Sequence, residues 1–237
     1  MKKLAIISAF SVLGAMASAQ LTGNLYLAQA NDAGANFVNQ EFGDFPTFST
    51  GIGNVVTFSS AVNLTDVQLR MVDVGSWVSG GVNQARLTIS QFSGVPSANH
   101  TFGTASVGGD IMYSAIVNAS ITNVSGTLFN FVGDASGVQN LAAGTYVVSL
   151  TGIADFAVRG QAFTQASAAQ ASDSWARNPG GGFALPIGTA WGTLSAASSG
   201  GMREASMGIN GAAVPEPATM AILGLGVAAL ARRRARK

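Results

Sequence analysis

The chain has 237 residues, no cysteine, and charged residues at only 10% of the sequence. Residues 20–217 carry five arginines, no lysine and all 11 acidic residues, a net charge of −6, because the other seven basic residues lie at the two ends. These numbers exclude disulfides and cysteine nucleophiles, and an acidic middle region without a basic patch argues against nucleic acid as a partner. A 48% hydrophobic content is not typical of disorder, so we expect one domain that is stabilised by burial.

The N-terminus has the three parts of an export signal. Two lysines precede an apolar segment, residues 4–16, and the small residues Ala17 and Ala19 follow it at the spacing that signal peptidase requires. An apolar segment of this length is too short to span a bilayer core. We therefore expect residues 1–19 to be a signal peptide, and the mature chain to begin at Gln20.

Alternation of apolar and polar side chains predicts an all-β ectodomain over residues 20–194. The alternation is clearest at residues 67–71, 85–90 and 145–150, as a half-buried strand requires. Weaker strands are predicted at residues 21–28, 54–60, 111–117, 126–132, 155–159, 190–194 and 206–210. Gly and Asn pairs separate many of them, and roughly ten short strands with turns between them predict a two-sheet antiparallel sandwich.

Three segments do not show the strand pattern. Residues 164–171 are rich in Ala and Gln but have neither caps nor an apolar stripe, so we expect a loop. Residues 178–182, Asn-Pro-Gly-Gly-Gly, fit neither a helix nor a central strand. Residues 195–213 are expected to hold the last strand and then a Gly/Ser/Ala-rich spacer.

Few residues offer catalytic or metal-binding chemistry. His100, the single histidine, lies among polar residues without a nucleophile elbow, so we expect a solvent-exposed loop residue. Glu41 and Asp44 lie near each other and could form a hydrolytic carboxylate pair, but a solvated surface acid and a turn acid explain them as well. We expect no enzyme and no cofactor. Sandwich domains can carry one structural calcium ion, although no Asp-x-Asp-x-Asp loop is present.

Aromatic residues raise the question of carbohydrate binding. The chain has three tryptophans, Trp77, Trp175 and Trp191. Trp175 precedes Asn178 and the glycine loop, so it has neighbours that suit a sugar contact, although large aromatics more often fill a core. Asn-x-Ser/Thr sequons also occur, at Asn63, Asn99, Asn118 and Asn123. In an Asn- and Ser-rich chain such sequons arise by chance, and surface glycosylation stays open.

The C-terminal segment, residues 214–237, has three parts. Pro215-Glu216-Pro217 precedes 14 apolar residues at 218–231, and then Arg232, Arg233 and Arg234. A helix over 218–231 would measure about 21 Å, less than the ~30 Å of an average hydrocarbon core. Arginine side chains that reach the interface would help it to span, and the positive-inside rule keeps the basic end in the cytoplasm. An ordinary short anchor is the alternative.

These three parts together resemble the sorting tail of the PEP-CTERM family. The resemblance implies that exosortase, a membrane-embedded protease, removes the tail in a Gram-negative bacterium that makes exopolysaccharide, often in biofilms. The domain before the tail is similar in style to the jelly-roll sandwiches found ahead of such tails, notably at residues 141–146 and 175–191.

We therefore predict an exported protein of the cell surface or extracellular matrix, which is held only transiently in the inner membrane. Its expected role is structural or adhesive and non-enzymatic, and its expected partners are signal peptidase and exosortase. The alternative is a carbohydrate-binding module that contacts exopolysaccharide through an exposed tryptophan, and a secreted hydrolase is a third reading.

Overall fold

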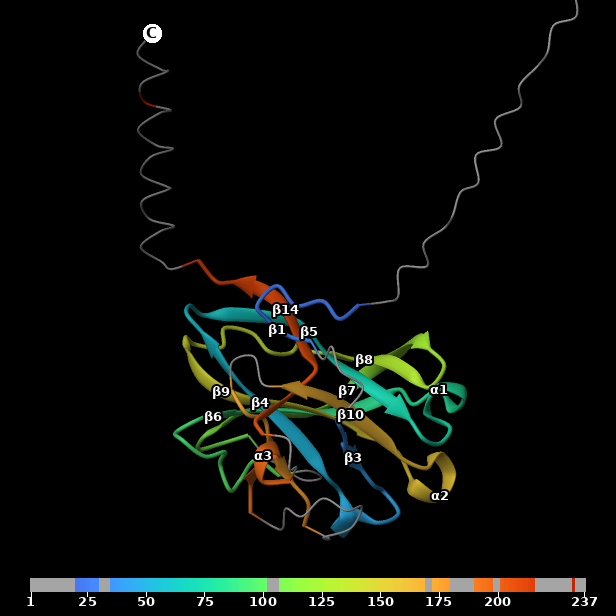
Figure 1. The fold of residues 1–237 in the computed structure, drawn as a ribbon. Helices are drawn as coiled ribbons and strands as arrows, with labels where there is room; N and C mark the ends of the chain where they lie inside the picture. Colours follow the sequence, from blue (N-terminus) through green and yellow to red (C-terminus); the bar gives the residue numbers. More distant parts are fainter. Residues whose placement is uncertain are drawn as a thin grey trace, which may run out of the picture.

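The fold is all-β and almost entirely antiparallel (Figure 1). This computed structural model describes residues 20–29, 35–101, 107–168, 172–179, 190–197, 201–215 and 232. Its strands are β1 Tyr26–Ala28, β2 Ala35–Val38, β3 Gln40–Glu41, β4 Gly51–Phe58, β5 Val62–Asp73, β6 Gln84–Gln91, β7 Ile111–Ser125, β8 Leu128–Asp134, β9 Gly144–Ile153, β10 Ala162–Ala168, β11 Trp175–Arg177, β12 Gly192–Thr193, β13 Arg203–Ala205 and β14 Met207–Ala213. Short helical turns lie at η1 Pro46–Phe48, α1 Trp77–Gly80, α2 Phe156–Arg159 and α3 Leu194–Ala197.

Two sets of strands share one hydrophobic core. The first runs β1-β14-β5-β8, and the second runs β6-β9-β4. Strand β7 belongs to both, because its first half pairs with β6 up to Asn118 and its second half pairs with β8 from Ala119 onward. A strand that changes sheets in this way forms a corner between packed layers. Buried side chains from both sets then meet between them.

The alternation in β5 explains how its side chains reach this core. Val67, Leu69 and Met71 are all buried, and the residues between them are at least partly exposed. The alternation shifts by one at Thr65, where β14 pairs Asn210 with Asp66 but Gly211 with Leu64. This β-bulge returns Leu64 to the core side, so burial continues to the start of the strand.

Trp77 fills the end of the core from the short turn α1. Its side chain is fully buried, and its ring meets the Phe131 ring edge to face at 5.9 Å. Gly152 on β9 lies beneath the ring, where a Cβ atom would come within 2.4 Å of Trp77 Cζ3. The absence of a side chain at residue 152 therefore makes room for the tryptophan.

A buried polar network closes the other side of the fold, next to a smaller apolar cluster that contains Ile52, Ala176 and Leu194. Tyr26 on β1 donates a hydrogen bond to the carboxylate of Glu204 on β13. Asn54 on β4 donates to the Tyr26 hydroxyl oxygen at 3.0 Å and to the Ala205 carbonyl at 2.8 Å, and it accepts from Ser174 at 2.6 Å. The network links the first strand to β4 and β13, which lie far from it in the sequence.

The clear alternating segments are confirmed as strands, and several other expectations are wrong. Segments 67–71, 85–90 and 145–150 lie within β5, β6 and β9. Residues 164–168, expected to be loop, belong to β10, where the small residues Ala162, Thr164 and Ala166 alternate into the interior. Their small size hid the period-two pattern, because neither alanine nor threonine carries a strong hydrophobic signal.

Two expected strands contain helical turns. The last strand expected at 206–210 is confirmed by β14, but it continues through residues 211–213, which were expected to be spacer. Residues 156–159 form α2, and the strand expected at 190–194 is reduced to β12 before α3 begins at Leu194. Residues 207–213 are paired in β14 up to Ala213. The glycines and alanines of that segment suggested flexibility, but they also permit the close approach of neighbouring strands.

Candidate functional site

The end of β14 positions the start of the C-terminal segment, residues 214–237. Its last residue, Ala213, pairs with Val62 on β5, and the Val214 amide donates to the Ala61 carbonyl oxygen at 2.7 Å. Pro215 follows directly and is exposed, as is Arg232. The other predicted residues of the two signals lie outside the described residues: Ala17, Ala19, Glu216, Pro217, Arg233 and Arg234.

The apolar segment at 218–231 also lies outside the described residues. Within the ranges that the structure describes, no helix is long and apolar enough to cross a membrane.

Two asparagines hold β14 in place just before its end (Figure 1, where β1 and β14 lie side by side). Asn210 donates from its side chain to the Asp66 carboxylate at 2.8 Å, and its side-chain oxygen accepts the Asn24 amide at 3.1 Å. The Asn24 side chain donates to the Gly211 carbonyl at 2.8 Å and accepts the Gly211 amide at 2.9 Å. The chain is therefore fixed at residues 210–211, four residues before Pro215.

His100 is buried, and the expectation of an exposed loop histidine is wrong. The imidazole lies between two serines, with Nδ1 at 2.7 Å from Ser90 Oγ and Nε2 at 2.6 Å from Ser149 Oγ. Burial, and then the nearby charge of Arg177, lowers the pKa of His100 to about 3, so the ring is neutral near pH 7. Its polar sequence neighbours suggested a loop, whereas its partners lie on the distant strands β6 and β9.

The two acids considered for hydrolysis have other partners. Glu41 forms a two-point ion pair with Arg86 on β6, with Nε–Oε2 at 2.8 Å and Nη2–Oε1 at 3.1 Å, so it is not a solvated surface acid. Asp44 is exposed, and its two carboxylate oxygens accept the amides of Phe156 and Ala157, both at 2.9 Å. Desolvation acts to raise the pKa of Asp44, but the backbone hydrogen bonds from Ala157 and Phe156 together lower it below its usual value. The Glu41 carboxylate therefore binds a side chain of β6, and the Asp44 carboxylate binds the backbone of α2.

The tryptophans differ in their exposure. Trp77 is fully buried, while Trp175 and Trp191 are each partly buried. The Trp175 ring packs against Phe92 at 6.1 Å, and Trp191 donates from its indole nitrogen to the His100 carbonyl at 3.2 Å. Asn178 has no exposed surface, so its expected role as a direct sugar contact does not agree with its position.

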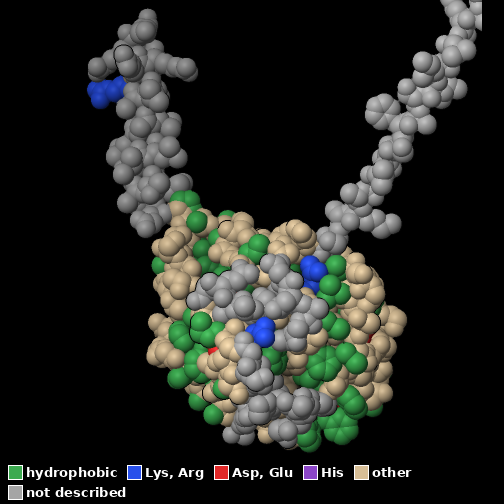
Figure 2. All heavy atoms as spheres, viewed as in Figure 1, with side chains coloured by type: hydrophobic (Ala, Val, Ile, Leu, Met, Phe, Trp, Pro, Cys, Tyr) green, Lys and Arg blue, Asp and Glu red, His purple; other side chains and the backbone are tan. Residues whose placement is uncertain are grey.

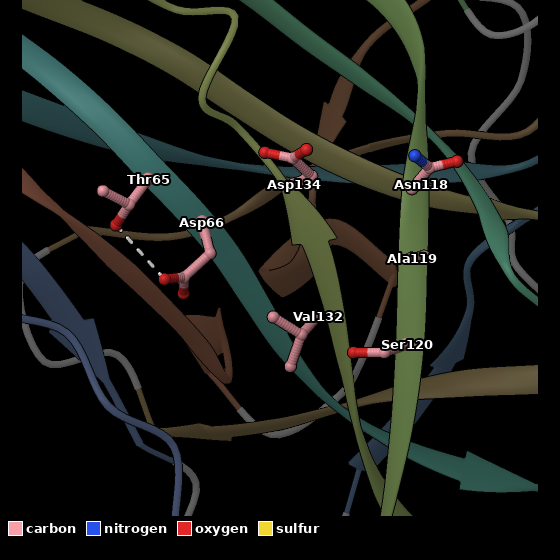
Figure 3. Close-up of a pocket in the computed structure, with 7 residues that line it drawn as sticks. All are labelled: Thr65, Asp66, Asn118, Ala119, Ser120, Val132 and Asp134. Carbon is pink, nitrogen blue, oxygen red and sulfur yellow. Dashed lines mark hydrogen bonds between the residues drawn. The ribbon is translucent and has the colours of Figure 1, made fainter.

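A shallow hollow of about 330 Å³ lies at the corner where β7 changes sheets. Figure 3 shows Asp66 on β5, Asp134 on β8 and Asn118 on β7 around it. Hydrogen bonds from the Ser136 side chain and backbone lower the pKa of Asp134. Asp66 and Asp134 are paired across the two strands, but no described group of three or more His, Asp or Glu residues could hold a metal ion. The hollow therefore offers no third acidic ligand for a cation.

The surface around these features carries few charges. Among the described residues on the face seen in Figure 2, most side chains are apolar or uncharged polar, with isolated basic and acidic groups. Three of the sequon asparagines, Asn99, Asn118 and Asn123, are exposed, and Asn63 is partly buried.

The fold and its C-terminal connection define an all-β domain that leads directly into a tail segment. Residues 213–237 match the model of the PEP-CTERM protein-sorting motif, so this chain is a PEP-CTERM domain-containing protein. The motif indicates an exported protein that exosortase, a membrane protease, processes on the way to the cell surface. No curated protein and no solved structure shows significant similarity to this chain.

Proposed function

We propose that this protein is a non-enzymatic component of the cell surface or extracellular matrix, with a structural or adhesive role. Signal peptidase removes residues 1–19, the segment 218–231 spans the inner membrane transiently, and exosortase then releases the domain from its tail. The domain itself is a jelly-roll-like antiparallel sandwich. The observation that carries the proposal is the sorting motif at residues 213–237, which follows a folded all-β domain without a break.

The positions of the reactive side chains support a non-enzymatic role. His100 is enclosed by Ser90 and Ser149, and Glu41 is paired with Arg86. A general acid or base must reach the substrate, whereas the His100 imidazole is buried and neutral. These groups stabilise the fold instead.

The test is the intact mass of the protein from its native host, with and without the sorting enzyme. We expect a species that begins at Gln20 and ends near Pro215–Pro217, found only when the enzyme is present. The processing of Glu216→Gln is compared with that of the natural chain. This variant removes one charge of the motif and leaves the described fold untouched. A C-terminus at Lys237 in both strains would leave a membrane-anchored ectodomain and would refute the sorting proposal.

The second candidate function is carbohydrate binding through Trp175. The partial exposure of this ring favours it, since aromatic faces stack on the apolar face of a pyranose. Binding of the full chain to the host exopolysaccharide should then fall at least tenfold in Trp175→Ala, which corresponds to about 1.4 kcal/mol. The control is Val95→Ala, which changes another exposed apolar residue. Equal binding by both variants would exclude Trp175 as the contact.

A further inference from the structure

The sorting motif overlaps the folded domain. The matched segment starts at residue 213, which is still part of β14 and is paired with Val62. The next residue donates its amide to Ala61 at 2.7 Å. No unpaired residues therefore separate the sheet from Pro215. This inference depends on the proposed processing of the tail, since it concerns how a protease gains access to the start of the motif.

A strand within a sheet is a poor protease substrate. Proteins that bind an extended peptide commonly pair with its backbone amides and carbonyls, as an added strand does. The backbone of residues 212–214 is already paired with β5 and its preceding residue Ala61. The same groups cannot pair with the sheet and with an enzyme at the same time.

We propose that the last three residues before Pro215, residues 212–214, detach from β5 and present an extended segment to the membrane protease. The hinge lies between Asn210 and Gly211, opposite the bulged residue Thr65 of β5, where the register between the two strands shifts. The processing site is thus gated by the opening of one strand end, and the domain before the hinge stays folded.

Burial along β14 supports a hinge at this point. Met207 and Ile209 are fully buried, so the first part of the strand is anchored in the core. Beyond the hinge, Ala212 and Ala213 are exposed and place no side chain in the core. Opening at the strand end therefore breaks backbone hydrogen bonds but uncovers little apolar surface, and local openings of this kind need less free energy than global unfolding.

The pairing on the two sides of β14 also changes at the proposed hinge. Strand β1 pairs with β14 only as far as Ile209, and the Asn24 and Asn210 side chains fix the chain at residues 210–211. After Gly211 the described partners lie on the β5 side alone. The segment that we propose to detach is therefore held along one edge, whereas the segment before it is held along two.

A disulfide between β5 and the end of β14 tests the proposal, and the natural chain has no cysteine that could interfere. Asn63 and Ala212 are opposed in the register, and neither side chain lies in the core. We would express full-length Asn63→Cys/Ala212→Cys in the native host and measure the C-terminal mass with the bond oxidised and after growth with a reductant. Oxidation should lower the processed fraction at least about tenfold, because the processing-competent state is no longer populated. Reduction should restore it.

The matched control is Thr57→Cys/Thr145→Cys, which joins β4 to β9 at an opposed surface pair away from the hinge. We expect its processing to equal that of the natural chain in both redox states. Normal processing of oxidised Asn63→Cys/Ala212→Cys, with natural processing intact, would overturn the strand-opening proposal alone. Failure of the natural chain to be processed would overturn the sorting proposal, and this inference with it.

Hydrogen exchange of the full-length chain gives a measurement that does not depend on the enzyme. The Val214 amide, which donates to the Ala61 carbonyl, should exchange at least about a hundredfold faster than the Ile209 amide, because only the strand end opens locally. Equal protection at these two amides would show that β14 opens as one unit, and would contradict a hinge at Asn210/Gly211.

Discussion

His100 illustrates how a single residue acquires its role from distant partners. Its ring nitrogens lie within hydrogen-bond distance of serines on β6 and β9, and its backbone carbonyl accepts the Trp191 indole. One histidine thus connects two strands and a later loop. In the sequence these partners lie between 10 and 91 residues away, so no local pattern could have revealed them.

The depressed pKa of His100 predicts a specific loss of stability in acid. The pKa is lowered from 6.5 to about 3 in the folded protein, so between these values the unfolded chain binds more protons than the folded one. Stability from the neutral ring is complete above pH 6.5 and decreases as the pH falls toward 3. From pH 7 to pH 4.5 we expect a loss of about 2–3 kcal/mol from this residue.

The measurement is urea unfolding of the natural chain and of His100→Gln at both pH values. Glutamine does not titrate, so the variant should lose less stability between them by that amount. Asp44 and Asp134, whose pKa values are lowered from 3.8, stay ionised in both folded proteins over this range and do not contribute to the difference. Identical pH dependence in the two proteins would mean that His100 is accessible to protons in the folded state.

The Arg86–Glu41 pair makes a second prediction at the residue scale. Its side chains are only 10% and 13% exposed, so removal of one partner leaves a poorly solvated charge. Glu41→Ala should lower the free energy of unfolding by about 2–4 kcal/mol. The double variant Glu41→Leu/Arg86→Met should recover most of that loss, because neither charge remains. Urea midpoints at constant slope would measure both effects, and an equal loss in the double variant would point to packing rather than charge.

At the scale of elements, strands with large alternating side chains were predictable and strands built from small residues were not. Val67, Leu69 and Met71 mark β5 in the sequence, and the structure places all three in the core. Strand β10 buries Ala162, Thr164 and Ala166, which carry almost no hydrophobic signal. Its pairing with β2, β5 and β13 stabilises it, and such pairing is a tertiary property.

The contact between β9 and α1 predicts the effect of one added methyl group. A Cβ atom at residue 152 would lie 2.4 Å from Trp77 Cζ3, so Gly152→Ala must displace the indole or the strand. We expect a loss of about 1–3 kcal/mol, the usual effect of overpacking a core. Urea unfolding and the near-UV circular dichroism of the tryptophan would detect it. Thr145→Ala, which changes an outer position of the same strand, should leave the near-UV spectrum unchanged.

At the scale of the whole molecule, the two hydrophobic clusters should unfold together. Strand β4 passes through both regions, because its first residues pair with β11 and its later residues pair with β9. A network of side-chain hydrogen bonds also connects the two regions, through Tyr26, Asn54, Ser174 and Glu204. Neither cluster can lose its strands without exposing the other.

Single-tryptophan variants test this cooperativity. One variant would retain Trp77 in the main core, and another would retain Trp175 beside β4, with phenylalanine at the other two tryptophan positions. Within each variant, the urea midpoint from fluorescence should coincide with the midpoint from far-UV circular dichroism. A fluorescence transition at lower urea in the Trp175 variant would show that the region around β11 unfolds first.

Composition and local pattern are enough to predict the class of fold, the acidic and cysteine-free character of the domain, and the sorting motif. These properties are local or compositional: alternation needs only neighbouring residues, and the motif is one continuous segment at residues 213–237. The tertiary structure decided which groups meet. It buried His100, joined Glu41 to Arg86, enclosed Asn178 and extended β14 to Ala213 without a spacer. Each of these depends on pairing between residues far apart in the chain, and small or polar side chains leave no periodic signal from which such pairing can be predicted.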